Sequence, residues 1–374
     1  MLISSIRTLV SVLVLAGPLA LAGPLALFSA DNLPLGPPVA LTAQQEAGQR
    51  VIYSYAGLNP PASLLQRISA GEAAGVIFFG GNISSEAQIT SVINTLRAAN
   101  AKSPVKEPLL LMTDQEGGEV RRLPGAPAQS EKQIGASANP AAQATAAGTG
   151  AAQNLSGVGM NLNLAPVIDV YRTPGDFDDQ FGRSYSTNPT VAGSLGAAFT
   201  TAQQQAGVAA TVKHFPGLGA ATASENTDNG PVTLNVSLSD LRNIDEAPYT
   251  AAINAGAKLV MVSWATYPAL DASHPAGLSS AIVQGELRNR LGFKGVTITD
   301  ALEAGALNPD GTIAQRAVAA AGAGMDLILC SAQDATEGDA AENALVGGLQ
   351  SGQLDANDFN AAVQRVSNLR SGLH

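Results

Sequence analysis

The sequence predicts an α/β protein with a single (β/α)8 barrel, or TIM barrel, domain. From about residue 45 onward, short apolar runs alternate with longer Ala-rich segments, as βα units do. Eight such runs can be placed, which is the number of strands that closes this barrel. Most runs are apolar throughout, as in strands buried on both faces of a parallel sheet. A doubly wound open sheet is the alternative fold, and the lack of a Gly-x-Gly-x-x-Gly turn before an early helix weakens it.

The expected elements follow the chain in a regular order. The predicted strands are residues 51–55, 76–80, 109–113, 160–166, 208–214, 259–264, 296–300 and 327–331. Helical patterns lie between them at residues 84–99, 141–158, 191–206, 251–255, 279–291 and 314–323. Polar side chains stand at or just past the ends of several strands: Asp114, Asp169, His214, Trp264 and Asp300. Because strand carboxyl ends converge on one mouth of a barrel, we expect a shared site there rather than separate helix caps.

Residues 1–30 are typical of a secretory signal peptide. Arg7 precedes a long apolar stretch, and Ala20-Leu21-Ala22 provides an A-x-A cleavage pattern. An uncleaved membrane anchor is the alternative, since the stretch is nearly long enough to span a bilayer. Pro18 and Pro24 interrupt it and favour cleavage.

The next segment, residues 31–44, contains three prolines and is predicted to be a linker. Residues 45–374 are predicted to form the barrel. The single cysteine, Cys330, lies far from the apolar stretch, which excludes a lipoprotein anchor, and it is expected to be a buried small side chain. We therefore expect a secreted or otherwise extracytoplasmic protein.

The composition restricts the possible partners. Only 13% of residues are charged, the net charge is −10, and no cluster of Lys and Arg occurs. These features argue against nucleic acid and against an anionic membrane surface, and no integral membrane partner is expected. A neutral substrate fits better. The three histidines form no ligand pair, so no metal and no cofactor is expected, and a metal-dependent hydrolase is a poor interpretation. We expect a monomer.

Five segments resemble signature motifs of glycoside hydrolase family 3, and they occur in the family's order. They are TDQEGGEVRRL at 113–123, MNLNLAPVIDV at 160–170, FGRSYS at 181–186, KHFPG at 213–217 and LGFKGVTITDAL at 291–302. One motif alone is weak, but together they are specific. With no second sandwich or open-sheet domain, the chain is similar to the family's single-domain branch. That branch consists chiefly of β-N-acetylglucosaminidases (β-hexosaminidases) that act on cell-wall fragments.

The resemblance implies a role for each matching residue. Asp300 is implied to be the nucleophile that forms a covalent glycosyl-enzyme, and Asp114 to bind sugar hydroxyls. The same sugar ring is implied to be surrounded by Arg122, Arg183, Lys213 and His214. These residue types suit the task, because a carboxylate and forked donors hold pairs of hydroxyls. Cationic neighbours are also expected to keep Asp300 ionised. A plain salt bridge of the Lys213-His214 pair to the barrel wall is the alternative, and it can coexist with binding.

The loop after KHFPG departs from the family. The single-domain branch carries its acid/base on an Asp-Ser-His triplet there, and this chain has Ser-Glu-Asn at 224–226 with Leu218 in place of an upstream histidine. Glu225 and Asp228 are the carboxylates of the replacement loop. Either can act as the acid/base if its surroundings raise its pKa. Asp228 can equally brace its own turn. We expect this loop to be mobile, with few anchors.

Two further alternatives follow from the same departure. Ser263-Trp264 stands where the family commonly has Ala-His, and Trp264 either fills the core or forms a stacking platform for a sugar. The missing histidine also leaves room for a sugar-binding pseudoenzyme, although retention of Asp300 argues against it. A β-glucosidase-type specificity is a third possibility within the family.

Overall fold

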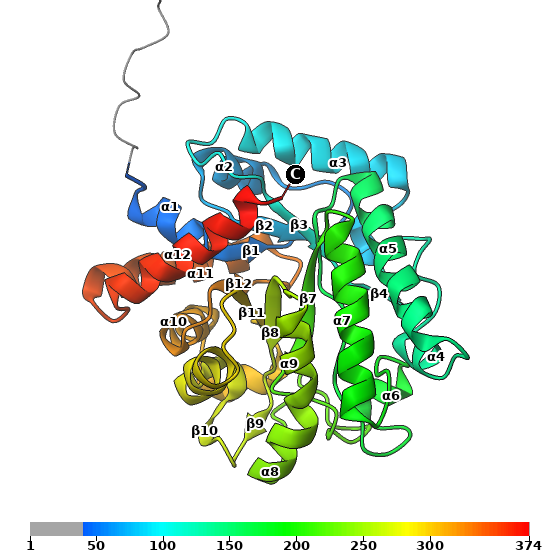
Figure 1. The fold of residues 1–374 in the computed structure, drawn as a ribbon. Helices are drawn as coiled ribbons and strands as arrows, with labels where there is room; N and C mark the ends of the chain where they lie inside the picture. Colours follow the sequence, from blue (N-terminus) through cyan, green and yellow to red (C-terminus); the bar gives the residue numbers. More distant parts are fainter. Residues whose placement is uncertain (1–39, 374) are drawn as a thin grey trace, which may run out of the picture. The chain divides into compact units, whose positions relative to one another are not determined.

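The computed structural model describes residues 40–373, and these form a closed barrel of eight parallel strands surrounded by helices (Figure 1). Chain order and barrel order agree, and β12 pairs with β1 to close the sheet. The barrel strands are β1 (Val51–Tyr53), β2 (Gly75–Ile77), β3 (Leu110–Thr113), β6 (Leu162–Asn163), β7 (Ala209–Phe215), β8 (Leu259–Val262), β11 (Val296–Ala301) and β12 (Leu327–Leu329). All eight predicted strands and the (β/α)8 fold are therefore confirmed.

The predicted signal peptide or anchor lies outside the described residues, as does most of the predicted linker. Helix α1 (Ala43–Gly48) begins two residues before the predicted start of the barrel domain at residue 45, because Thr42 and Gln45 form a capping box. None of the helices within residues 40–373 is long and apolar enough to cross a membrane.

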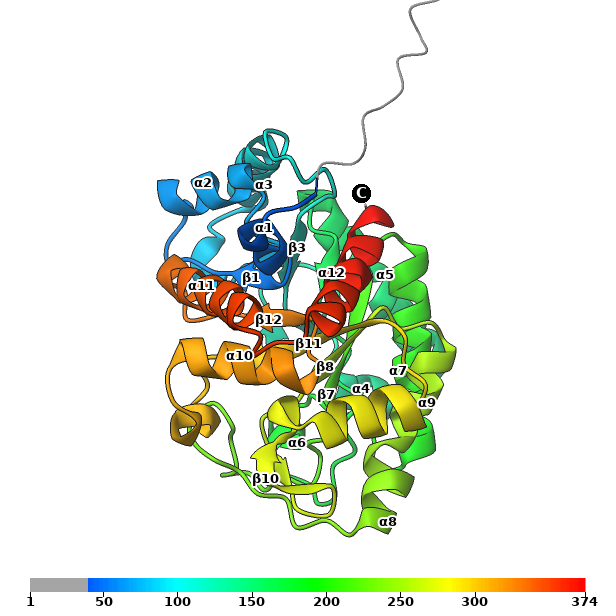
Figure 2. The ribbon, with the colours of Figure 1, turned by 90° about the vertical axis from the view of Figure 1, so that its left-hand side faces the viewer.

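Each helical pattern corresponds to a helix in the structure. These are α3 (Glu86–Asn100), α5 (Pro140–Val158), α7 (Pro189–Gln205), α9 (Ala247–Asn254), the π-helix η4 (Ala281–Arg290) and α10 (Ile313–Ala323). The structure adds several helices that the sequence did not predict, among them α2 (Ala62–Ala70), α11 (Ala335–Ser351) and α12 (Ala356–Ser371). Helix α1 packs against both α11 and α12 (Figure 2).

Helix α11 packs very close to the barrel wall, and a glycine permits it. A Cβ added to Gly338 would lie 2.3 Å from the ring of Tyr53 on β1. At this contact, the ring of Tyr53 on the strand supplies the apolar surface that the glycine lacks. The first half of α11 therefore buries small apolar side chains such as Ala335 and Ala341, and the larger Leu345 and Val346 are buried in its second half.

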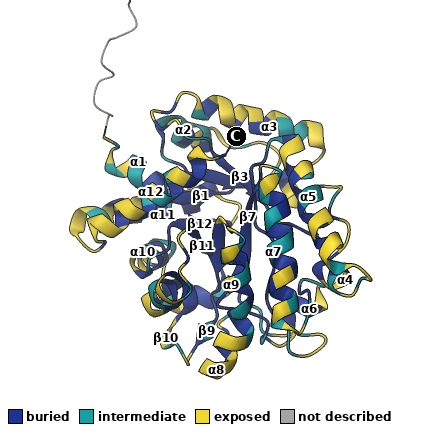
Figure 3. Cartoon of the chain, in the orientation of Figure 1, coloured by how far each residue is buried: buried dark blue, intermediate teal, exposed yellow. Residues whose placement is uncertain are grey.

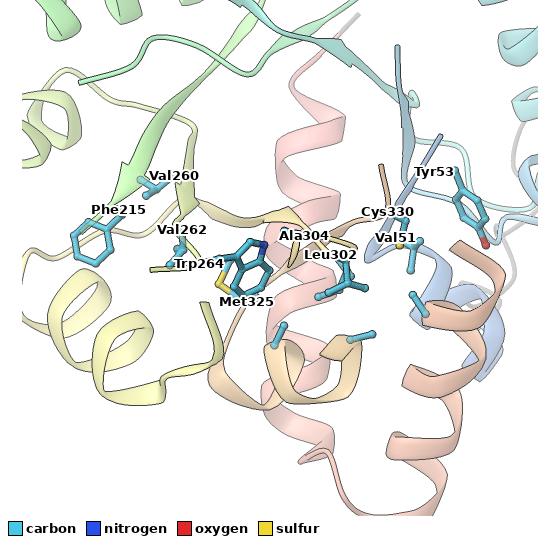
Figure 4. Packing of buried hydrophobic residues seen from close by; sticks show 14 of the residues in the cluster. Val51, Tyr53, Phe215, Val260, Val262, Trp264, Leu302, Ala304, Met325 and Cys330 are labelled. Carbon is cyan, nitrogen blue, oxygen red and sulfur yellow. The ribbon is translucent and has the colours of Figure 1, made fainter. Parts of the chain in front are cut away.

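The hydrophobic core has an inner and an outer layer. The strands and the inward faces of the helices are buried, while the outward helix faces are exposed (Figure 3). Inside the barrel, the layer of side chains nearest the carboxyl ends of the strands comes from every second strand. It consists of Ile77, Met261 and Leu329 from β2, β8 and β12, together with Leu164, which directly follows β6. The outer layer lies between strands and helices and includes Cys330, which is buried as predicted (Figure 4).

Several short elements extend the carboxyl ends of the strands. The hairpin β4–β5 (Gln115–Gly117 and Val120–Arg121) follows β3, and the short helix α6 (Phe177–Gln180) follows β6. The pair β9–β10 (Thr266–Tyr267 and Asp271–Pro275) follows β8. Figure 1 shows α6, β9 and β10 together at the lower end of the view. The hairpin β4–β5 and helix α6 contribute to the walls around the barrel mouth.

Candidate active site

A cavity of about 230 Å³ opens at the carboxyl ends of the barrel strands. Its floor is the apolar four-residue layer described above, and its walls are polar. Among the predicted site residues, it is lined by Asp114, Arg122, Arg183, Lys213, His214, Asp228 and Asp300. The structure thus brings together every predicted site residue except Glu225 and Trp264.

Asp300 lies near the end of β11 and faces this cavity. Its Oδ1 accepts a hydrogen bond of 2.8 Å from the backbone N–H of Ala301. Burial raises the pKa of Asp300 above its usual value and the nearby Asp228 adds to this rise, while His214 and, less strongly, Lys213 oppose it. Lys213 forms its ion pairs with Asp114 and Glu116 instead. Cationic neighbours therefore favour the ionised form of Asp300 less than the sequence suggested.

Lys213 and Arg183 are linked by a carboxylate that the sequence analysis did not single out. The Nζ atom of Lys213 lies 2.7 Å from Asp114 Oδ1 and 2.7 Å from Glu116 Oε1. Arg183 donates to both carboxylate oxygens of Glu116, at 2.8 and 3.0 Å. Burial alone would raise the pKa of Glu116, but these two cations lower it to about 2. The salt bridges weighed as an alternative for Lys213 are thus present, in the wall of the cavity itself.

Arg183 also donates to Asp178 at 3.0 Å, so it holds two buried carboxylates at once. Removing one partner of such a group leaves uncompensated buried charge. Removal of Asp114 has a different consequence, because its partner Lys213 would still form an ion pair with Glu116.

We therefore expect Arg183→Ala to lower the free energy of unfolding by about 3–5 kcal/mol. Asp114→Ala should cost stability little and should weaken sugar binding by about 1.5–3 kcal/mol, the value of a charge-assisted hydrogen bond. Urea denaturation of both variants, with calorimetric titration of the sugar into Asp114→Ala, measures the two effects. Equal, small losses of stability would contradict the structural role of Arg183.

His214 is held by a buried carboxylate. Its Nδ1 lies 2.7 Å from Asp169 Oδ2, and Asp169 also accepts from the backbone N–H groups of His214 and Leu218. Burial, with a smaller contribution from Arg183, lowers the pKa of His214 to about 4. The imidazole is therefore neutral at pH 7. Because an ionised carboxylate can only accept, Nδ1 carries the proton and Nε2 keeps its lone pair.

Asp169, Asp178 and His214 present potential metal ligands within 4.8 Å of one another. Two of the potential ligand groups are engaged, His214 Nδ1 with Asp169 and Asp178 Oδ1 with Arg183, whereas Asp178 Oδ2 has no hydrogen-bond partner among the described residues. This arrangement is typical of a hydrogen-bond network that orients a histidine.

The assignment of His214 gives a prediction for NMR. Because the pKa of His214 is lowered to about 4 and Asp169, whose pKa burial raises to about 6, is still ionised at neutral pH, the ring should stay neutral, as the Nδ1–H tautomer, from pH 8 down to pH 7. Its ¹⁵N shifts, assigned by comparison with His214→Gln, should not change over this range. A doubly protonated ring at pH 6 would contradict this assignment and would show that Asp169 stabilises the imidazolium form of His214.

The loop after β7 places its two carboxylates differently. Glu225 accepts hydrogen bonds from the backbone N–H and the hydroxyl of Thr222, at 2.7 and 2.8 Å, and lines a separate surface hollow. Asp228 lines the cavity with Asp300. Although Asp228 is exposed to solvent at the mouth, the protein packed around it on the cavity side, with Glu303 and Asp114 nearby, raises its pKa by desolvation and charge repulsion.

This loop has more anchors than the sequence suggested. The carbonyl oxygens of Thr227 and Asp228 accept from the backbone N–H groups of Ala306 and Gly305, both at 2.9 Å. A Cβ added to Gly305 would lie 2.6 Å from the backbone of Asn229, so the contact requires glycine. The loop is therefore docked on the segment that follows Asp300. Asn226, which stands in place of the family's histidine, also lines the cavity and accepts from the N–H of Asp228.

Trp264 does not reach the cavity, which corrects its assignment to substrate binding. Its side chain is 1% exposed and packs in the outer core layer, near Val262 and Met325 (Figure 4). Its Nε1 donates to the carbonyl oxygen of Ala301 at 2.8 Å. The buried hydrogen bond satisfies the indole, and the core-filling alternative holds.

The cavity thus combines two carboxylates with a wall of donors and acceptors. Among the described residues, Arg122 Nε has no hydrogen-bond partner, so this guanidinium retains a free donor beside the cavity. Such an arrangement can hold a polyhydroxylated ring and perform nucleophilic and acid/base steps on it.

Known proteins resemble this chain along most of its length. A profile described as Glycosyl hydrolase family 3 N terminal domain matches residues 48–369. An uncharacterized secreted glycosyl hydrolase of Arthroderma benhamiae is 47% identical over 349 residues, which are 93% of this chain and 98% of that protein. A β-hexosaminidase of Xanthomonas campestris is 35% identical and covers 68% of this chain and 76% of its own length.

Solved structures show a similarity over most of this chain as well. A family 3 β-N-acetylglucosaminidase from Paenibacillus superposes with a TM-score of 0.84 at 33% identity, over 89% of this chain and 63% of that longer one. A β-N-acetylhexosaminidase from Beutenbergia cavernae gives a TM-score of 0.80 at 31% identity, over 88% of this chain and 99% of that one.

Proposed function

This chain belongs to glycoside hydrolase family 3 and is a β-hexosaminidase-like glycoside hydrolase, and on that premise we propose that it is an exported, retaining β-N-acetylglucosaminidase. Its substrates are β-linked N-acetylglucosamine-containing fragments of cell-wall or chitin type. The observation that carries the mechanism is that Asp300 and Asp228 line one cavity, while Glu225 faces away from it. Export is supported by the pattern of residues 1–30.

In the first step, a carboxylate oxygen of Asp300 attacks the anomeric carbon. The bond from that carbon to the leaving oxygen breaks, and the Asp228 carboxyl group donates its proton to that oxygen. A raised pKa suits Asp228 to this role, because a larger fraction of it is protonated when the substrate binds. The product of this step is a covalent glycosyl-enzyme.

In the second step, the Asp228 carboxylate removes a proton from water as the water attacks the same carbon. The bond to Asp300 breaks, the sugar leaves with retained configuration, and Asp228 is protonated again. Throughout, Asp114, Lys213 and Arg183 hold the ring by its hydroxyls, with Arg122 and His214 Nε2 as a further donor and acceptor.

A panel of aryl β-glycosides tests the proposal on the mature protein. The N-acetyl-β-D-glucosaminide is expected to give the highest kcat/KM, and NMR of the first product should show the β-anomer. Faster cleavage of the glucoside would favour a β-glucosidase. The absence of the loop histidine supports one further candidate, a sugar-binding pseudoenzyme, which predicts bound sugar without cleavage of any aryl glycoside.

A further inference from the structure

Phe181 is an exposed aromatic side chain beside the cavity. It is 41% exposed and is one of three large hydrophobic side chains that are exposed among the described residues, with Leu58 and Leu238. Its ring packs edge-to-face against Phe177, with centroids 5.8 Å apart and planes at 80°. Phe177 lines the cavity. The two rings therefore form a continuous aromatic surface from the cavity wall to solvent.

This aromatic surface is fastened to the loop that carries Asp228. The N–H of Phe177 donates to the carbonyl oxygen of Ala221 at 2.9 Å, and Gln180 Nε2 donates to that of Ala223 at 2.9 Å. A leaving group must contact the proton donor through its oxygen. Since the apolar floor closes the cavity below, the rest of that group extends outward, past this loop and α6.

A second hollow, of about 440 Å³, adjoins Phe181. Two segments form walls of both hollows: the β4–β5 hairpin and residues 177–183. Around Phe181, the second hollow carries Glu119, Lys132 and Gln133, and Lys132 is fixed by an ion pair of 2.7 Å to buried Asp179. A sugar ring presents an apolar face and a rim of hydroxyls. An aromatic ring flanked by polar groups matches both.

We propose that Phe181, supported by Phe177, binds the second sugar of a β-linked oligosaccharide, on the leaving-group side of the cleaved bond. The inference rests on the proposed function and specifies it: the preferred substrate is a chain of at least two sugars rather than a glycoside with a small aglycone. The second hollow provides the hydroxyl partners of that sugar.

The test compares two substrates that differ in the leaving group alone: methyl N-acetyl-β-D-glucosaminide and di-N-acetylchitobiose. Phe181→Ala is expected to lower kcat/KM for the disaccharide about tenfold, as one aromatic contact allows, and to change it less than about twofold for the methyl glycoside. Phe181→Trp should retain the preference, and Phe181→Leu, which keeps the contact with Phe177 but not the flat face, should lose it. Leu238→Ala is the matched control, because Leu238 is 39% exposed and lines neither hollow.

The proposed subsite would be refuted if Phe181→Ala left kcat/KM for the disaccharide unchanged, or if it lowered kcat/KM equally for both substrates. Titration calorimetry distinguishes failure of the subsite from failure of the proposed function, because it measures sugar binding without requiring cleavage. If the unmodified protein cleaves neither substrate, the proposed function fails. The subsite is then supported if the disaccharide binds more tightly than N-acetylglucosamine and Phe181→Ala removes the difference, and it is refuted if both sugars bind equally.

Discussion

Asp300→Asn is expected to lower kcat for every glycoside by roughly four to six orders of magnitude, as loss of a covalent nucleophile does in other hydrolases. The amide has the shape of the carboxylate, and its oxygen can still accept from Ala301 N–H. What is lost is the attacking charge, so even a glycoside with a dinitrophenyl leaving group should not be rescued. Stopped-flow measurement of the released phenol provides the test.

The stability of Asp300→Asn supplies the control. Burial raises the pKa of Asp300 in the folded state, so its stability contribution is present at low pH and is lost as the pH rises through that pKa. At pH 7 the variant should therefore melt at the same temperature as the unmodified protein or higher, and the difference should vanish in acid. Labelling with a 2-fluoro glycoside should place the adduct on Asp300, and an adduct on another carboxylate would contradict the assignment.

Asp228→Asn is expected to have an effect that depends on the leaving group. For an alkyl or sugar leaving group, which needs a proton, kcat/KM should fall by roughly 10²–10⁴-fold. For a dinitrophenyl leaving group, which needs almost none, the glycosylation step should change only a few-fold. Plots of rate against leaving-group pKa for the variant and the unmodified protein show the contrast directly.

Glu225→Gln is the matched control for this prediction, because Glu225 belongs to the same loop but bonds to Thr222 outside the cavity. It should leave both substrates unaffected. If Glu225→Gln instead reproduced the leaving-group dependence, the loop would have to rearrange on binding. Equal, small effects from both variants would exclude a loop carboxylate as the proton donor.

The fold could be predicted because its signal is repeated. Eight apolar runs of similar length, six of them followed by a helical pattern, are compatible with few architectures, and an error at one strand end changes little. Of the two helices after β12, which were not predicted, α12 buries a regular apolar face of Phe359, Ala362, Val366 and Leu369. In α11, Gly338 takes the place of an apolar side chain where the helix touches Tyr53, and the charged Glu337 and Glu342 are also buried, which reduces the contrast between its two faces.

Strand ends predicted part of the site, because a strand sets the direction of its side chains, whereas Arg122 and Arg183 lie outside the barrel strands and were predicted from the family motifs. Asp300 and Lys213 belong to barrel strands, whose ends point into the mouth. Glu225 and Asp228 lie on a loop, where neighbours in the sequence can face opposite ways, and the bond to Thr222 decided the outcome. Glu116 was overlooked although it stands two residues after Asp114 in the same motif, a spacing that in an extended segment puts two side chains on one side.

The floor of the cavity has a consequence for how such enzymes can diverge. Met261 and the other three floor residues contact the cavity above and the barrel interior below. A smaller side chain there would deepen the cavity, but it would also open the core, at about 2–5 kcal/mol for a change such as Met261→Ala. The walls come from loops and a hairpin, which tolerate substitution and insertion. New substrate preferences should therefore arise in descendants through changes in these loops, while the floor persists because the barrel depends on it.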